Sequence, residues 1–223
     1  MIKGILIDFG GTIDSDGIHW FDAFSAAYAM VADVPKELLW DAYVNTERTL
    51  GRNPIIKPTD TFCKTLQIKI ALQTEYLQSK GITVTEQDTI LDTCYNKVVK
   101  HISSVSKPVL ERLYTKYPMV LVTNFYGNMH TVLSEFGLDH LFTEVIESSV
   151  VGVRKPDPAI FRLGVAALGL TPAETVMIGD SPDKDIVPAQ SIGCQTILLQ
   201  GKSWSEVQCT PDRTVSTLQE ITF

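Results

Sequence analysis

Residues 2–12 of the 223-residue chain read Ile-Lys-Gly-Ile-Leu-Ile-Asp-Phe-Gly-Gly-Thr, and this stretch decides the expected fold. Its first half, 2–7, is an almost unbroken apolar run without alternating polar positions. Such a run is typical of a strand buried on both faces, as in a parallel sheet covered by helices. The run ends at Asp8, and Gly10 and Gly11 then allow a sharp turn and a close approach of backbone to ligand. We therefore expect a central strand whose carboxyl end carries an acid.

Similar apolar runs recur later in the chain, and helical patterns separate them. The runs cover residues 119–122, 175–178 and 195–199, with a weaker candidate at 143–146. Apolar residues spaced for one helical face cover residues 109–117, 129–136 and 160–168. Strands that alternate with helices in this order predict an α/β fold with a doubly wound parallel sheet.

The segment from residue 15 to residue 104 interrupts this alternation, because it contains no run typical of a buried strand. Helical patterns cover residues 20–31, 35–50, 62–77 and 85–102. We predict that residues 15–104 form a helical cap domain inserted into an α/β core domain made of residues 1–14 and 105–223. Hinges are expected near residues 14–18 and 103–108.

Composition excludes several classes of protein. The chain is 44% hydrophobic and 20% charged, which suits a folded protein with a sizeable core. No run of about 18 apolar residues is present, and the net charge of −7 disfavours nucleic acid and anionic membranes as partners. The four cysteines are widely spaced, which disfavours a disulfide framework or a zinc site. We expect a cytoplasmic protein, either a monomer or a homodimer, without a signal peptide.

Polar residues follow three of the expected strands. Asp8, Thr123 and Asp180 stand at strand ends, Asp185 comes five residues after Asp180, and Lys155 lies in a loop between strands. Taken singly, each has an ordinary explanation, such as a helix cap for Asp185. Together at one sheet edge, the acids would repel one another and require a cation, and an all-oxygen site suits Mg²⁺. With Lys155 as a second positive charge and Thr123 as a donor, the set predicts phosphoryl-transfer chemistry.

The four motifs resemble those of the haloacid dehalogenase-like hydrolase superfamily. They are residues 8–12 (DFGGT), 123–124 (TN), 154–158 (RKPDP) and 179–185 (GDSPDKD), in the order that the family has. The resemblance covers essentially the whole chain, and the insertion after the first motif resembles the family's four-helix cap. It implies a Rossmann-like core with a cap domain.

The resemblance also implies catalytic roles. Asp8 would be the nucleophile that forms an aspartyl-phosphate. Thr123 would donate a hydrogen bond to the phosphoryl group, and Lys155 would offset the negative charge of Asp8 and the phosphate. Contacts with the substrate would come from three further residues: Gly11, Thr12 and Asn124.

For the metal, the resemblance implies a Mg²⁺ site built from oxygen ligands. Asp8 would contribute its other carboxylate oxygen, and Gly10 its main-chain carbonyl. Asp180 would be a direct ligand, and Asp185 would bind the metal directly or hold one of its waters. The substrate would be a small phosphorylated molecule.

Gly10 departs from the pattern of the family's phosphatases, which carry a second aspartate two residues after the nucleophile. That aspartate is a general acid for the leaving group and then a base for water, and such catalysis contributes roughly 10²–10⁴-fold. Glycine does neither. Asp14 and Asp16 are the nearby candidates for a substitute.

Three readings follow from this departure. The first is a Mg²⁺-dependent phosphatase that acts on a small phosphorylated metabolite and is specialised in its leaving group. The second is another hydrolase of the family without the general acid, such as a phosphonate-cleaving enzyme that uses a cap lysine as a Schiff base. The cap lysines considered for that role are Lys36, Lys57, Lys64 and Lys69. The third is a degenerate member that binds a phosphorylated ligand or a protein partner.

Four features have less defined roles. His19 is expected to be a surface or core residue rather than a catalytic base. Trp20 fits either the cleft between cap and core or the cap's own interior. Trp204 and the tail 215–223 are expected to pack on the edge of the core.

Overall fold

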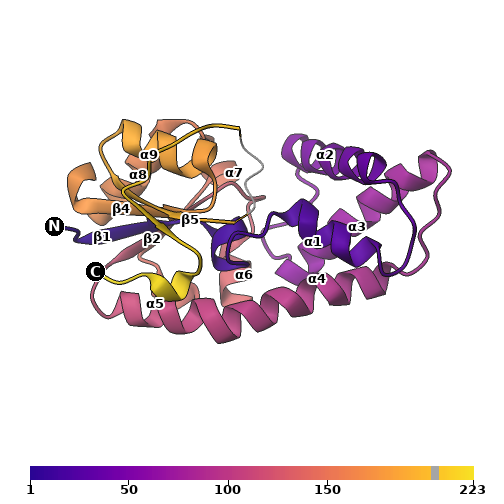
Figure 1. Cartoon of the computed structure of the whole chain (residues 1–223), viewed down its shortest axis with the longest axis horizontal. Helices are drawn as coiled ribbons and strands as arrows, with labels where there is room; N and C mark the ends of the chain where they lie inside the picture. The colour runs from indigo at the N-terminus through magenta and orange to yellow at the C-terminus, as the bar shows by residue number, and fades with distance from the viewer. Residues whose placement is uncertain (202–205) are drawn as a thin grey trace.

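The computed structural model describes residues 1–201 and 206–223, so that Trp204 lies outside the described residues. Figure 1 shows a sheet covered by helices at one end of the molecule and a group of helices at the other end. No helix among the described residues is both long and apolar enough to cross a membrane.

The sheet has six parallel strands in the order β3-β2-β1-β4-β5-β6. Their bounds are β1 Gly4–Ile7, β2 Met119–Thr123, β3 Glu144–Glu147, β4 Thr175–Gly179, β5 Gln195–Leu199 and β6 Arg213–Val215. The prediction of a doubly wound parallel sheet is confirmed. The strand order reverses direction between β1 and β4, which is where ligands bind in such folds.

Successive residues of the central strands pack into two different hydrophobic layers. Ile5 and Ile7 of β1 belong to a cluster that extends into the inserted helices, whereas Leu6 packs with Phe161 on the opposite face. Both faces of β1 are therefore dry, which explains its unbroken apolar sequence. The helices of this half are α5 Lys107–Tyr114, α6 Met129–Glu135, α7 Ser148–Val151, α8 Pro158–Leu168 and α9 Val187–Ser191.

The inserted segment folds into helices, which Figure 1 shows beside the sheet half of the molecule. They are α1 Trp20–Tyr28, α2 Lys36–Arg52, α3 Phe62–Ser79 and α4 Gln87–His101. The predicted apolar stripe of α3 is buried, including Phe62, Leu66 and Ile70. Gly81 follows the helix with a positive φ of 85°, as expected for a residue that ends a helix. The division of the chain at residues 14 and 104 stays a prediction.

The two connections between the halves, where hinges are predicted, each have defined local contacts. Residues 102–106 form a helical turn that joins α4 to α5 without leaving the helical region of backbone conformation. The apolar pattern explains this, because Val98, Ile102 and Val109 are all buried. At the other connection, the Asp16 carboxylate accepts hydrogen bonds from Thr217 Oγ1 at 2.7 Å and from Leu218 N at 3.0 Å.

The C-terminal tail packs on the core, as the sequence predicts. Val215, Leu218 and Ile221 are buried. Strand β6 was not predicted, because three residues are too few to show an alternating or continuous apolar pattern. It pairs in parallel with β5 through Arg213, Thr214 and Val215.

The packing of α8 against the sheet yields a prediction about stability. Phe161 is fully buried against the sheet, whereas Leu163 of the same helix is 40% exposed. We expect Phe161→Ala to lower the free energy of unfolding by about 3–5 kcal/mol, because it leaves a cavity in a close-packed layer. Urea denaturation measures this, with Leu163→Ala as the matched control at about 0.5 kcal/mol or less. Equal losses in the two variants would contradict the assigned packing.

Candidate active site

The ends of β1, β2 and β4 bring three of the predicted residues to one edge of the sheet. Strand β1 lies between β2 and β4, with Ile7 in register with Leu121 and Ile178. Asp8 follows β1, Thr123 ends β2, and Asp180 follows β4. These side chains therefore meet at the crevice where the strand order reverses.

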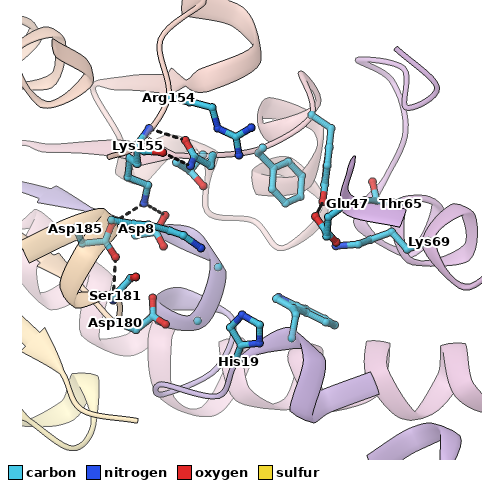
Figure 2. A pocket seen from close by; sticks show the side chains of 18 of the residues that line it. Asp8, His19, Glu47, Thr65, Lys69, Arg154, Lys155, Asp180, Ser181 and Asp185 are labelled. Carbon is cyan, nitrogen blue, oxygen red and sulfur yellow. Dashed lines mark hydrogen bonds and ion pairs between the residues drawn. The ribbon is translucent and has the colours of Figure 1, made fainter. Parts of the chain in front are cut away.

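Lys155 connects two of the acids across this crevice. Its Nζ lies 2.7 Å from Asp8 Oδ1 and 2.7 Å from Asp185 Oδ1 (Figure 2). All three side chains are buried. Burial alone would lower the pKa of Lys155, but the carboxylates of Asp185 and Asp8 outweigh it and hold this pKa above its usual range. Lys155 is therefore a fixed positive charge.

Asn124 holds the main chain of Lys155 in place. Its Oδ1 accepts from Lys155 N at 2.9 Å, and its Nδ2 donates to Lys155 O at 3.0 Å. The sequence predicts a substrate contact for Asn124. Both ends of the amide are engaged with the Lys155 backbone, so the side chain positions the lysine. Asn124 also lines the cavity, and its contact with the substrate stays a prediction.

The acids form a cluster that one lysine does not neutralise. Asp8, Asp180 and Asp185 each offer a carboxylate oxygen, and these three atoms lie within 4.8 Å of one another. Burial raises the pKa of Asp185 to about 6, with Lys155 opposing and Asp8 adding to this rise. Burial and the charges of Asp185 and Asp8 raise the pKa of Asp180 well above its usual range. Such a set of oxygen donors fits a divalent cation of the Mg²⁺ type, which would relieve this repulsion.

The turn after β1 is shaped around Asp180. Gly11 has a φ of 83°, and a Cβ at this position would collide with the Asp180 carboxylate. Thr12 is fully buried, and its Oγ1 donates to Asp180 Oδ1 at 3.3 Å. Both residues were predicted to contact the substrate. Thr12 does not line the cavity and contacts Asp180, whereas Gly11 lines the cavity and donates its N–H to Asp14 at 2.6 Å, so that its contact with the substrate stays a prediction.

Neither candidate for the missing general acid faces the reacting groups. Asp14 is buried, does not line the cavity, and accepts from Gly11 N and from Trp20 Nε1, the latter at 2.7 Å. Burial raises the pKa of Asp14 to about 7. Asp16 binds the C-terminal tail. Gly10 lines the cavity with an ordinary φ of −77°, and a Cβ there would meet no atom within 4 Å.

A cavity of about 210 Å³ lies over the acids, and the inserted helices supply its opposite wall. This volume is below the roughly 300–1,000 Å³ of typical drug-sized ligand pockets, so it suits a small ligand. The lining includes Thr123, which is buried. It also includes Trp20, for which the sequence allowed either the cleft or the interior of the cap.

His19 also lines the cavity. Its side chain accepts from Phe21 N at 3.2 Å and so caps α1. Burial and the charge of Lys184 lower the pKa of His19 to about 4, so the ring is neutral at pH 7.

The wall opposite the acids contains an ion pair that sequence reasoning missed. Lys69 Nζ of α3 lies 2.6 Å from Glu47 Oε1 of α2, and Tyr126 donates its hydroxyl to Glu47 Oε2 at 2.5 Å. Figure 2 places Glu47 and Lys69 across the pocket from Asp8 and Lys155. The sequence contains one signal for this pair: Lys69 falls on the buried apolar stripe of α3, where lysine is unusual.

Comparison with known proteins agrees with this geometry. A family model described as a haloacid dehalogenase-like hydrolase matches residues 2–193. The chain belongs to this family. The expected resemblance is therefore confirmed, and the acidic crevice lies where the family motifs converge.

Two similar curated proteins are phosphatases. Phosphoserine phosphatase of Thermus thermophilus is 37% identical over 86 residues, which are 38% of this chain and 34% of that protein. Glyceraldehyde 3-phosphate phosphatase of Methanocaldococcus jannaschii is 38% identical over 91 residues, 40% of this chain and 40% of that protein. The matching segments thus span about a third to two fifths of these relatives.

A solved structure of 2-haloacid dehalogenase from Pseudomonas syringae matches over nearly the full length. It covers 99% of this chain and 96% of its own, with 23% identity and a TM-score of 0.55. At this identity the likeness shows the shared fold alone.

The acid cluster predicts how metal and pH affect stability. Because the folded-state pKa of Asp180 is raised, its contribution to stability is full below about pH 4 and declines as pH rises toward the raised value. Asp180→Asn removes this decline. In EDTA at pH 7 we expect Asp180→Asn to unfold at least about 2 °C above the wild type, since 1 kcal/mol corresponds to about 2–4 °C in a chain of this size.

Mg²⁺ should reverse the order. We expect it to raise the Tm of the wild type and to have little effect on Asp180→Asn, as differential scanning fluorimetry measures. Asp183→Asn is the matched control, because Asp183 accepts from Ser181 Oγ and lies outside the acid cluster. Equal Mg²⁺ stabilisation of all three proteins would contradict the site.

Proposed function

We propose that the protein is a Mg²⁺-dependent phosphatase that acts on a small phosphorylated metabolite through an aspartyl-phosphate at Asp8. The observation that carries this proposal is the contact of Lys155 Nζ with both Asp8 and Asp185 inside an acidic cluster. A buried carboxylate beside a fixed cation and a cation site is equipped to attack an anionic phosphoryl group.

In this proposal each residue at the crevice has a defined task. Asp8 attacks phosphorus with a carboxylate oxygen, and the bond from phosphorus to the leaving oxygen breaks. Water then hydrolyses the acyl phosphate and releases inorganic phosphate. Lys155 offsets negative charge on Asp8 and on the phosphoryl oxygens, and the Thr123 hydroxyl donates to the phosphoryl group.

Asp180, Asp185, Asp8 and the main-chain carbonyl of Gly10 would hold Mg²⁺. The bound ion would supply charge neutralisation for the phosphoryl oxygens. Thr12 donates its hydroxyl to the Asp180 carboxylate, and Asn124 holds the backbone of Lys155 through two hydrogen bonds. We propose these two as positioning residues.

Gly10 defines the leaving group that suits this site. Around Gly10 there is open space rather than a carboxylate, and neither Asp14 nor Asp16 lines the cavity. His19 is neutral at pH 7 and thus poor at supplying a proton. We infer that the preferred leaving groups depart without protonation, as a carboxylate does from an acyl phosphate, whereas simple alkyl phosphates react slowly.

The alternative of a Schiff-base enzyme finds less support. Among the four cap lysines considered, Lys69 lines the cavity, whereas Lys36, Lys57 and Lys64 are exposed outside it. Burial alone would lower the pKa of Lys69, but Glu47 and Tyr43 outweigh it and raise this pKa. Schiff-base formation requires a neutral amine, so an ammonium paired with Glu47 favours the phosphatase.

The two phosphatase relatives support the same class of reaction, although their names describe those proteins and the matches cover only part of them. The acid cluster also argues against a metal-free dehalogenase, because three carboxylate oxygens so close together are suited to bind a cation.

The proposal predicts turnover that depends on both Mg²⁺ and Asp8. We expect the wild type to hydrolyse acetyl phosphate and p-nitrophenyl phosphate with Mg²⁺, and to lose this activity in EDTA. Asp8→Asn should reduce kcat by at least about 10³-fold, because the amide is not a nucleophile. Wild-type activity equal to that of Asp8→Asn, with Mg²⁺ bound, would favour the binding-only alternative.

The account of Gly10 predicts a gain of function. Gly10→Asp should raise kcat for alkyl phosphates by at least about 10-fold and change acetyl phosphate little, because only the poor leaving group needs a proton. Gly10→Asn is the matched control, of similar size without an acid. A series of aryl phosphates should show a weaker dependence of rate on leaving-group pKa in Gly10→Asp. Equal rates in the two variants would refute the account.

A further inference from the structure

The wall of the cavity opposite the acids carries a donor and an acceptor side by side. Glu47 and Lys69 form an ion pair at 2.6 Å, and both residues line the cavity. Tyr126, which follows β2, orients Glu47 through its hydroxyl at 2.5 Å. The pair is thus fixed by three separate segments of the chain.

Lys69 is held as an ammonium rather than as a mobile surface cation. It is 7% exposed, and its Nζ lies 5.9 Å from the ring centres of Trp20 and Phe24 and 5.3 Å from that of Tyr126. An ammonium has three N–H donors, and Glu47 contacts it from one side only. The aromatic rings fix its position while leaving hydrogen-bonding capacity toward the cavity.

The pair is electrically neutral, and this determines which ligand group it suits. A lone carboxylate near Lys69 would face the Glu47 carboxylate, and a lone ammonium near Glu47 would face Lys69. A hydroxyl avoids both conflicts, because it accepts a hydrogen bond from Lys69 and donates one to Glu47. It also needs less desolvation than a charged group.

Position and size limit where this hydroxyl lies on the ligand. Figure 2 places Glu47 and Lys69 across the pocket from Asp8 and Lys155. The cavity between them has about 210 Å³. A phosphoryl group at Asp8 therefore leaves room for a short organic part that ends at the ion pair.

We propose that Glu47 and Lys69 are specificity-determining residues that select a small phosphate compound bearing an uncharged hydroxyl on its organic part. This inference rests on the proposed function for the location of the phosphoryl group. It goes beyond that function in assigning the class of the organic part and the two residues that recognise it.

Binding, rather than turnover, tests the proposal. The probes are glycerol 3-phosphate, n-propyl phosphate, 3-phosphoglycerate and O-phosphoserine, titrated calorimetrically into Asp8→Asn with Mg²⁺. They represent a hydroxylated, an apolar, an anionic and a zwitterionic organic part. We expect glycerol 3-phosphate to bind at least about 10-fold more tightly than n-propyl phosphate, because hydrogen bonds to charged groups contribute about this much. It should also bind more tightly than the two charged compounds.

Substitutions then attribute this preference to the pair. Adding Lys69→Met or Glu47→Gln should reduce the difference between glycerol 3-phosphate and n-propyl phosphate to less than about 3-fold. Lys64→Met is the matched control, because Lys64 lies on the exposed side of α3, and it should keep the full difference. Circular dichroism and thermal unfolding establish that each variant is folded.

Several outcomes would overturn the proposal. Equal affinity for glycerol 3-phosphate and n-propyl phosphate would mean that no hydroxyl is recognised. Tighter binding of 3-phosphoglycerate or O-phosphoserine would mean that a charged group is selected. If the preference for glycerol 3-phosphate over n-propyl phosphate remained in Lys69→Met, the ion pair would only link α2 to α3. Selective binding without wild-type turnover would instead refute the proposed phosphatase and leave this inference standing.

Discussion

The unbalanced negative charge at the carboxyl ends of β1 and β4 is the constraint on which the rest of the site depends. Asp8, Asp180 and Asp185 place carboxylate oxygens within 4.8 Å of one another, and Lys155 touches two of these acids. One ammonium does not balance three clustered carboxylates, and their oxygen atoms together offer a site for a cation. Asn124 holds the Lys155 backbone through two hydrogen bonds, and so keeps the lysine in position beside the acids.

The inserted helices are joined to this edge by both apolar and polar contacts, which fixes the second wall of the cavity. The ring of Phe9, directly after Asp8, lies 6.0 Å from Phe62 at the start of α3 and 6.0 Å from Phe125 after β2. Glu135 at the end of α6 accepts hydrogen bonds from Phe62 N and from the Tyr95 hydroxyl, the latter at 2.8 Å. One buried cluster therefore extends from the sheet into the helices, and groups on the two walls have defined separations.

The sequence was sufficient for features that depend on local pattern and strand order. Apolar runs predicted the main strands, and the rule that ligands gather at carboxyl ends of strands brought Asp8 and Asp180 together. It was insufficient for contacts among distant segments: Glu47, Lys69 and Tyr126 belong to α2, α3 and the loop after β2, and their meeting depends on tertiary packing. The helical backbone at residues 102–106 was likewise not predicted, and the hinge expected near residues 103–108 stays a prediction.

The central claim is that Asp8 becomes phosphorylated during turnover, and a rapid acid quench tests it most directly. Wild-type protein is mixed with acetyl phosphate and Mg²⁺, quenched within one turnover, and digested for peptide mass spectrometry. The account predicts a phosphoryl group on the peptide that contains Asp8, present with Mg²⁺ and absent in EDTA and in Asp8→Asn. Phosphate release with Asp8 never labelled, or a label on another residue that persists in Asp8→Asn, would contradict it.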